Sequence, residues 1–496
     1  MQKEIFHATQ AEALSLFNTV DTPYTMNTPH QDKKKQAHQG GGLDRIAAQH
    51  KRGKLTARER IDALVDHGSF FELDQLVTAY QSDKKTYTDG VITGLASIDG
   101  RRIALFAQDF TMQGGSVGKH HAAKICKIMD HAAHIGCPII SLIDSGGARI
   151  GEGIHALAGY GDIFKRNVRY SGIIPQLSVI LGPCAGGAVY SPALTDLIFT
   201  VRGISQLFIT GPQVIAQVSG EQIDKEGLGG SDVHSSTSGV VHMVSEDEQS
   251  CLALVRTVLE YLPDNYKSLP PAKPSQEPPP SNLESLVPTE ITRSYDMTDV
   301  INCIVDTDSW CETSSRFAPN IITGFARMNG VSIGIVANQP LIKAGVIDID
   351  ASCKAARFIN LCNAFDIPIL SLVDVPGYLP GVDQEHGGII RHWAKLLHSY
   401  AHATVPLLTV IIRKSFGGAY IVMGSKQLGA DWVAAWPHAQ IAVLGAQTAV
   451  QIMHGKALAS EPAVQQEKKR LALEQEYTQQ FINPYTAAEN GYIDAI

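Results

Sequence analysis

The sequence contains an internal duplication. Residues 138–144 read PIISLID, and residues 368–374, which lie 230 positions later, read PILSLVD. A glycine pair follows in both halves, since Gly186 lies 42 residues after the end of the first segment and Gly417 lies 43 residues after the end of the second. Two copies in one register predict two similar domains in tandem, each with a glycine-rich turn at the same point of its fold.

The length and the proline content support a division into two domains. A chain of 496 residues is longer than one hydrophobic core usually serves. Seven prolines within 18 residues mark a stiff linker over 263–282. We therefore expect an N-terminal domain over 43–262 and a C-terminal domain over 283–496. A polar segment over 1–42 precedes them, and we expect it to be mobile.

Within each domain, apolar runs of strand length alternate with segments of helical periodicity. Strands are expected at 91–95, 102–107, 138–143, 175–181, 331–337, 368–373 and 406–412. Helices are expected at 118–133, 156–170, 351–364, 389–401 and 464–479, and one more after each glycine pair. This alternation predicts an α/β fold in which parallel strands are joined by right-handed helical crossovers.

The composition describes an ordinary globular protein. The net charge is −8 and the sequence pI is near 6.1, so the charge gives no reason to expect a nucleic-acid or anionic-membrane partner. Eight cysteines are scattered without a C-x-x-C motif, which favours reduced thiols. No apolar run approaches the ~18 residues of a membrane span, and the first residues lack a signal-peptide pattern. We expect a cytoplasmic protein.

The glycine-rich turns are the best candidates for a functional site. Each follows a buried strand and precedes a helix, so the first helical N–H groups have no partner within the helix and carry the positive end of its dipole. Without side chains, the oxygen of a ligand can approach these donors closely. Such donors can stabilise an oxyanion, and removing one costs roughly 3 kcal/mol. The alternative is that the glycines only allow the helix to pack tightly on its strand.

Other motifs give weaker signals. Residues 114–118 read GGSVG and match the G-x-S-x-G nucleophile elbow, but they do not directly follow a strand, and the second copy has no serine there. No lysine followed by serine or threonine comes after either glycine pair, which argues against a phosphate-binding loop of the Walker type. The histidines at 120, 121, 131 and 134 lack ligands at metal spacing, so we expect surface histidines and no metal.

A basic segment over 43–66 is open to two interpretations. It combines helical periodicity with arginine, lysine and histidine side chains. The segment is either a solvated helix face or an anion-binding site.

At these motifs the chain resembles the carboxyltransferase (beta) subunits of biotin-dependent acyl-CoA carboxylases, most closely the propionyl-CoA carboxylase type. The resemblance covers about residues 42–496. It depends on the following segments: QHKRGKLTARER at 49–60, DSGGARI at 144–150, residues 182–192, DVPG at 374–377, GGIIRH at 387–392 and RKSFGGAY at 413–420.

The resemblance implies two crotonase-like domains and a hexamer whose active sites lie between the N-terminal domain of one chain and the C-terminal domain of another. The first domain would bind acyl-CoA and the second carboxybiotin. In the implied mechanism CO₂ is released from carboxybiotin, the ureido anion removes the α-proton of the acyl-CoA, and the resulting enolate captures CO₂. No metal is needed for this step.

The resemblance also implies which residues act. The N–H groups of Gly186 and Gly187 would hold the enolate oxygen, and those of Gly418 and Ala419 the ureido oxygen of biotin. The acyl-CoA site would include Gly146, Gly147, Ala148, Tyr190 and Ile421. Relatives specific for propionyl-CoA often have aspartate where this chain has Ile421, which leaves acetyl-CoA and butyryl-CoA open as substrates beside propionyl-CoA.

The chain has neither a Met-Lys-Met biotinylation motif nor a segment large enough for an ATP-grasp domain. The biotin and the ATP chemistry are therefore expected on a partner, the biotin carboxylase and biotin carboxyl carrier (alpha) chain. Two alternatives stay open. One is the carboxyltransferase subunit of a sodium-pumping acyl-CoA decarboxylase, and the other is a non-catalytic assembly subunit.

Overall fold

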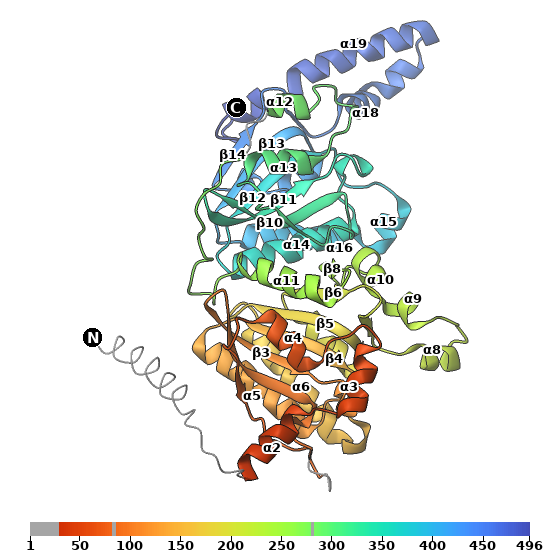
Figure 1. Cartoon of the computed structure of the whole chain (residues 1–496). Coiled ribbons are helices and arrows are strands. Elements are labelled where there is room, and N and C mark those ends of the chain that lie inside the picture. Colours follow the sequence, from red (N-terminus) through yellow and green to blue (C-terminus); the bar gives the residue numbers. More distant parts are fainter. Residues whose placement is uncertain (1–28, 82–85, 279–281) are drawn as a thin grey trace.

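The computed structural model describes residues 29–81, 86–278 and 282–496, and its two sheets follow one another along an elongated molecule (Figure 1). The prediction of a mobile N-terminal segment lies, for residues 1–28, outside the described residues. The described end of this segment contains helix α2 (Pro29–His38).

The first sheet has the strand order β1-β2-β3-β4-β5-β6-β8, and β7 pairs with the far end of β5. β1, β2 and β3 are antiparallel, whereas β3 to β8 are parallel. The expected parallel sheet is therefore mixed, because the two-residue connection after β2 is too short for a parallel crossover. The strands are β1 (Phe71–Leu73), β2 (Val91–Ile98), β3 (Arg101–Gln108), β4 (Ile139–Ser145), β5 (Gln176–Ala185), β6 (Leu197–Val201), β7 (Gln206–Phe208) and β8 (Met243–Ser245).

The second sheet repeats this topology with the order β14-β13-β12-β11-β10-β9, and β15 pairs with the far end of β13. An antiparallel β10–β11 hairpin again precedes the parallel strands. The strands are β9 (Cys311–Thr313), β10 (Ile321–Met328), β11 (Val331–Asn338), β12 (Ile369–Val375), β13 (Leu407–Phe416), β14 (Trp432–Ala435) and β15 (Gln440–Ala442).

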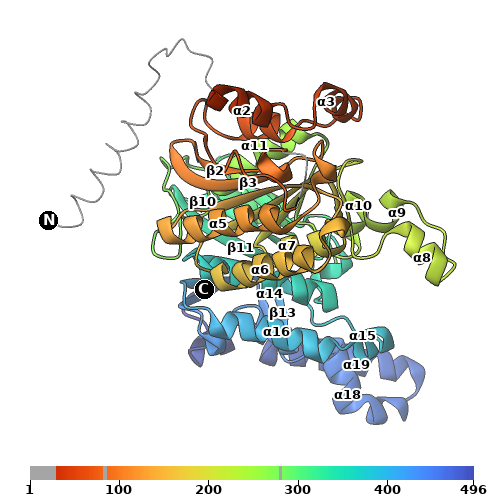
Figure 2. The same ribbon diagram turned by 90° about the horizontal axis from the view of Figure 1, so that it is seen from below.

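Paired helices cover the sheets (Figure 2). α5 packs on β2 and β3 and against α6, and α14 repeats this arrangement on β10 and β11 with α16. The first half contains α3 (Leu43–His50), α4 (Ala57–Leu64), α5 (Lys119–Ile135), α6 (Ile154–Tyr170), α7 (Tyr190–Ala193), α8 (Pro212–Val218), α9 (Lys225–Gly229), α10 (Ser231–Ser236) and α11 (Glu248–Leu259). The second contains α12 (Leu283–Leu286), α13 (Met297–Ile304), α14 (Ile349–Ala364), α15 (Val382–Gly387), α16 (Ile389–His402), α17 (Gly417–Val422), α18 (Ala446–Ala459), α19 (Ala463–Phe481) and α20 (Pro484–Glu489).

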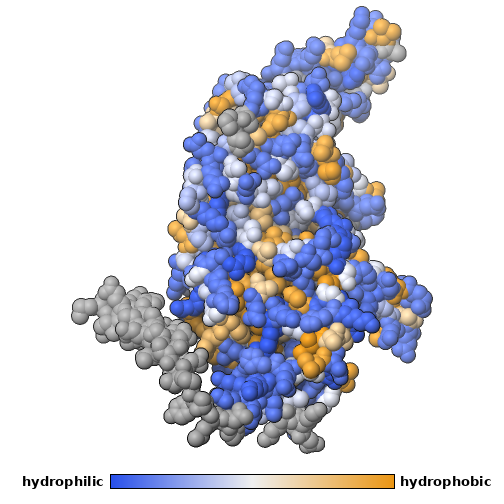
Figure 3. Space-filling view, in the orientation of Figure 1, coloured by the Kyte–Doolittle hydropathy of each residue, from blue (hydrophilic) through white to orange (hydrophobic). Residues whose placement is uncertain are grey.

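The two halves share a hydrophobic core. Residues of α11, such as Val255, belong to the same buried cluster as Phe325 of β10 and Phe358 of α14. Tyr261, which follows α11, stacks on Phe325 with 5.8 Å between ring centroids. In Figure 3 hydrophobic side chains also gather on the visible surface near the level where the halves meet.

The described part of the proline-rich linker, residues 263–278 and 282, has no helix or strand. Its backbone is held to the second half, because Lys273 N donates to Gly330 O at 3.0 Å and the side-chain Nη1 of Arg327 donates to Pro271 O at 2.7 Å. Pro279 and Pro280 lie outside the described residues. None of the helices that the structure describes is long and apolar enough to cross a bilayer.

Candidate active site

The first glycine turn joins β5 to a short 3₁₀ helix over Gly186–Val189, which continues as α7. Gly186 has φ 59°, in the left-handed region that favours glycine. No side chain caps this helix start among the described residues. The turn therefore presents uncapped N–H groups at the carboxyl end of a buried parallel strand, as the sequence predicted.

The second glycine turn has the same geometry. Gly417 also has φ 59°, and α17 begins there without a side-chain cap. Strand pairing fixes the correspondence, because Ala185 pairs with Phe208 of β7 and Phe416 pairs with Ala442 of β15. Gly186 is thus equivalent to Gly417. The predicted donors Gly418 and Ala419 therefore correspond to Gly187 and Ala188, one residue later than the pair predicted in the first domain.

The same register relates two residues predicted to bind substrate. Four positions after each of these glycines stand Tyr190 and Ile421, whose side chains are 44% and 39% exposed. Both lie on the short helix that follows the turn. Each domain therefore presents one partly exposed large side chain beside its own turn, and the structure does not bring Ile421 to the first turn of the same chain.

Two further loops meet the first turn. Gly146 N donates to Gly114 O at 2.9 Å, and Val117 N donates to Gly147 O at 2.9 Å. A Cβ added to Gly147 would lie 2.7 Å from Ala185 O, so only glycine fits beside the end of β5. The predicted residues 146–148 and the GGSVG segment at 114–118 therefore lie together at the first turn.

Arg149 ties these loops to one another. Its guanidinium donates to the Asp89 carboxylate and to Glu152, each at 2.7 Å, and to Ser116 O at 2.8 Å. The Ser116 hydroxyl donates to Gln113 O at 2.8 Å. Within the described residues no imidazole contacts Ser116, which fits the view that the G-x-S-x-G match is no nucleophile elbow.

An aromatic wall lines the first turn. A Cβ added to Gly187 would lie 3.0 Å from Cδ2 and Cε2 of Tyr160, a buried residue of α6. Tyr160 packs on Phe164 at 5.7 Å between centroids, and Phe164 contacts Tyr190 edge-on at 5.8 Å. Burial raises the pKa of Tyr160 further above its ordinary value, and its hydroxyl stays protonated. In the second domain the ring facing the turn belongs to Tyr378, 3.8 Å from a Cβ added to Gly418.

A buried charge network supports the strand that leads to the first turn. The Arg60 guanidinium donates to Asp144 at 2.9 Å, to Glu248 at 2.7 Å and to Leu181 O at 2.8 Å. Lys54 Nζ lies 2.6 Å from the nearer Asp144 oxygen. Burial lowers the pKa of Lys54, and its ion pair with Asp144 opposes that shift.

This network shows what the basic segment at 43–66 does. The segment is neither a solvated helix face nor an anion-binding site along its whole length. Lys54 and Arg60 are buried in ion pairs, whereas Arg45 and Arg52 line a cavity of about 310 Å³ together with Phe110, Gln113 and Gly114. Since Gly114 also contacts Gly146, this basic cavity adjoins the first turn.

The sequence missed the network because its carboxylates lie far along the chain. The signal that could have found it is the placement of Arg60 on the buried face of α4, next to Ile61 and Leu64.

Only some of the four histidines predicted at the surface are exposed. His131 and His134 are exposed, but His121 is completely buried, and burial lowers its pKa to about 3. His121 contacts Gln108 and the carbonyl of Asp89, which satisfies its ring nitrogens. The prediction for His121 was wrong because helical periodicity places it on the face of α5 that packs on the sheet.

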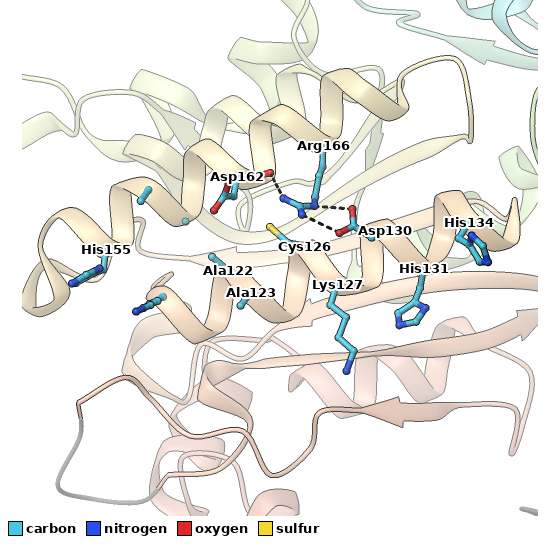
Figure 4. A pocket seen from close by; sticks show the side chains of 13 residues that line it. Ala122, Ala123, Cys126, Lys127, Asp130, His131, His134, His155, Asp162 and Arg166 are labelled. Atoms are coloured by element: carbon cyan, nitrogen blue, oxygen red, sulfur yellow. Dashed lines mark hydrogen bonds and ion pairs between the residues drawn. The ribbon is translucent and has the colours of Figure 1, made fainter.

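His131 and His134 instead line a groove of about 670 Å³ between α5 and α6 (Figure 4). In the groove Arg166 pairs with Asp130 at 2.8 Å. The described residues contain no cluster of three or more potential metal ligands.

Known proteins share this arrangement along nearly the whole chain. The family model described as carboxyl transferase domain matches residues 48–496. A propionyl-CoA carboxylase carboxyltransferase subunit of Haloferax mediterranei is 52% identical over 94% of this chain and 92% of its own length. The methylmalonyl-CoA decarboxylase subunit alpha of Propionigenium modestum is 50% identical over 94% of this chain and 91% of its own length.

Among solved structures, a hexameric 12S transcarboxylase with methylmalonyl-CoA bound matches with a TM-score of 0.90 at 44% identity. The match covers 94% of this chain and 90% of that chain. The two tandem α/β domains thus have the crotonase-like fold of these neighbours. The chain belongs to the carboxyl transferase domain family and is a carboxyltransferase of the propionyl-CoA and methylmalonyl-CoA type.

Proposed function

We propose that this chain is the carboxyltransferase subunit of a biotin-dependent acyl-CoA carboxylase that transfers the carboxyl group of carboxybiotin to the α carbon of a short-chain acyl-CoA, with propionyl-CoA preferred. The observation that carries the proposal is the pair of equivalent uncapped turns, one in each half of the chain. The reaction develops negative charge on two oxygens, that of the thioester and that of the biotin ureido group. Two sets of backbone donors suit this need.

The surroundings of the first turn suit an acyl-CoA. In this proposal the N–H groups of Gly186 and Gly187 donate to the thioester oxygen as the enolate forms, and residues 146–148 flank the acyl group. The adjoining cavity offers two guanidinium groups and the Phe110 ring, which suit the phosphates and the adenine of CoA.

The second turn would hold biotin. In this proposal the N–H groups of Gly418 and Ala419 donate to the ureido oxygen, which stabilises negative charge on it. Carboxybiotin, when bound, supplies both the carboxyl group and the base for the α-proton. The chain's own role is then to align the two reactants and to stabilise both oxyanions.

Exposed apolar side chains support a site shared between chains. Ile150 is 94% exposed and Ile154 and Leu157 of α6 are also exposed, directly after the loop at the first turn. Ile390 of α16 is exposed in the second domain. We propose that these surfaces pack together in a hexamer, as described for the 12S transcarboxylase, and that biotin arrives on a separate alpha chain.

The decarboxylase alternative is supported by the Propionigenium relative, which is 50% identical. Both functions share the transfer between acyl-CoA and biotin. A first experiment therefore incubates the purified, assembled protein with methylmalonyl-CoA and biocytin, and measures biocytin-dependent formation of propionyl-CoA. Absence of this reaction with methylmalonyl-, malonyl- and ethylmalonyl-CoA would leave the non-catalytic assembly subunit.

A second experiment separates the two enzymes. Fixation of ¹⁴C-bicarbonate with ATP and a cognate biotinylated partner, compared across acetyl-, propionyl- and butyryl-CoA, identifies a carboxylase and its preferred substrate. Sodium-dependent decarboxylation with a membrane partner, and no ATP-dependent fixation, identifies the decarboxylase.

A further inference from the structure

A cysteine and a histidine form a close pair outside both turns. Cys353 lies in the second turn of α14, and its Sγ is 2.9 Å from Nδ1 of His392 in α16. Both side chains are partly exposed. A thiol in hydrogen-bond contact with an imidazole is the arrangement in which a general base activates a sulfur nucleophile.

This contact distinguishes Cys353 from the other cysteines. All eight lie in the described part of the chain, and five of them are buried. Cys303 and Cys311 are exposed to a similar degree as Cys353. Among the described residues neither of them contacts an imidazole, so exposure alone does not set Cys353 apart.

Cys353 also lines two cavities. One of about 360 Å³ includes His392, and one of about 1,060 Å³ is lined by the cations of Arg357, Arg391 and Lys395. The single carboxylate lining the larger cavity, Asp196, accepts a hydrogen bond from Gln176 N at 2.8 Å. The larger cavity therefore favours a small anionic molecule beside the sulfur.

We propose that Cys353 is an activated thiol that forms mixed disulfides with small anionic disulfides, and that His392 acts as its base. His392 Nδ1 takes the thiol proton while the sulfur attacks one sulfur of the disulfide RS–SR. The S–S bond of the reagent breaks, a Cys353–S–SR bond forms, and the second half leaves as RS⁻, so Cys353 is oxidised and the reagent reduced.

At rest the pair is a protonated thiol beside a neutral imidazole, so the proton passes to His392 only as the sulfur attacks. Burial lowers the pKa of His392, and Lys395 and Arg391 lower it further, so the imidazole is neutral at pH 7 and can accept a proton. Burial raises the pKa of the Cys353 thiol, which opposes a resting thiolate, so the proposed reaction depends on the 2.9 Å contact through which His392 can take the proton during the attack.

Modification of Cys353 can affect the second glycine turn through the helices that connect them. α14 packs against α16, and α16 packs against α17, which begins at Gly417. A group inserted between Cys353 and His392 would separate α14 from α16 and displace α17. We expect modification to lower carboxyl transfer at least fivefold. Only this effect on turnover depends on the proposed function, because the thiol chemistry is measured without it.

The experiment treats the assembled wild-type protein with 5,5′-dithiobis(2-nitrobenzoate), an anionic disulfide, and locates the adduct by peptide mass spectrometry. Cys353 should react at least tenfold faster than Cys303 and Cys311, which serve as internal controls. If either of these reacts as fast as Cys353, the proposal is wrong.

Three further comparisons test its parts. His392→Gln should slow labelling of Cys353 at least tenfold, and an unchanged rate in an assembled variant would rule out His392 as the base.

Lys395→Gln should slow the reaction of Cys353 with the anionic reagent more than its reaction with the neutral disulfide 4,4′-dithiodipyridine. Equal slowing of both reactions would rule out the role of charge. Cys353→Ser should keep its activity after treatment, and equal inactivation of this variant would rule out the effect on turnover.

Discussion

Replacing Gly187 by alanine tests whether the first turn acts through closely approached backbone donors. The added Cβ would lie 3.0 Å from two ring carbons of Tyr160 and 3.3 Å from a third. These are tighter than ordinary van der Waals contacts, and the ring is buried against Phe164, so it cannot simply swing away. Overpacking of this kind typically costs about 1–3 kcal/mol.

The same displacement should move the N–H groups of the turn away from the oxyanion that we propose they hold. Loss of one such donor lowers kcat by about 10²–10³-fold, which corresponds to roughly 3–4 kcal/mol. We therefore expect Gly187→Ala to lower both the Tm and the kcat for carboxyl transfer from methylmalonyl-CoA to biocytin. A second substitution, Tyr160→Leu, should restore part of the Tm lost in Gly187→Ala, because it removes the ring that the Cβ meets.

Gly418→Ala is the matched control. Its added Cβ would meet only Tyr378 at 3.8 Å, an ordinary contact, so its Tm should stay close to that of the wild type. If Gly187→Ala keeps wild-type Tm and kcat, or if Gly418→Ala loses as much Tm, the steric reasoning fails.

Three other outcomes follow from the structure. Arg60→Met leaves the buried Glu248 without its cation and Asp144 with Lys54 alone, and should cost about 3–5 kcal/mol of unfolding free energy. Arg58→Met breaks a more exposed pair and should cost less, and equal losses of Tm would contradict this. Hydrogen bonds, the strongest from Gly100 N, lower the pKa of Asp66 in the folded protein to about 2 from its ordinary 3.8. The ionised carboxylate therefore stabilises the fold above pH ~4, and this contribution is lost as the pH falls towards 2. Asp66→Asn should flatten the dependence of the unfolding free energy on pH in that window, and an unaltered dependence would exclude this role. If Ile421 contacts the acyl group, Ile421→Asp should change the acetyl-to-propionyl ratio of kcat/KM by about tenfold or more, since a methylene is worth roughly 1–3 kcal/mol, whereas a packing role would lower both rates equally.

The sequence predicted those parts of the fold in which local pattern and burial agree. β4, β5 and β12 are buried on both faces along nearly their whole length, so they read as continuous apolar runs. Strands of three residues at the ends of the sheets, such as β1 and β9, are too short for any periodicity to be visible. The antiparallel hairpin was missed because strand direction depends on the connection and not on hydropathy.

The candidate site was only partly predictable for a similar reason. Both glycine turns were found because each is a local motif of strand, small residues and helix. The burial of Arg60 was not found, because its partners Asp144 and Glu248 lie 84 and 188 residues away. A run of basic residues therefore looked uniform, although the fold buries some of its members and exposes others.

The duplicated turns differ in what supports them, and the difference can be traced to one position. Gly182 corresponds to Arg413, because both stand four residues before the equivalent glycines. In the second domain the Arg413 guanidinium donates to Asp374 at 3.0 Å. In the first domain a side chain at Gly182 would lie 2.0 Å from the equivalent carboxylate, Asp144.

That space is instead occupied by Lys54 and Arg60, which come from the N-terminal segment and reach the same carboxylate. The second copy thus draws its cation from its own strand, whereas the first recruits it from the segment that also supplies Arg45 and Arg52 to the basic cavity. The basic segment at 43–66 therefore connects the first turn to the basic cavity. The second turn has no contact of this kind with the segment among the described residues. This asymmetry suits the proposal that an acyl-CoA with its phosphates binds at the first turn and biotin, which carries no phosphate, binds at the second.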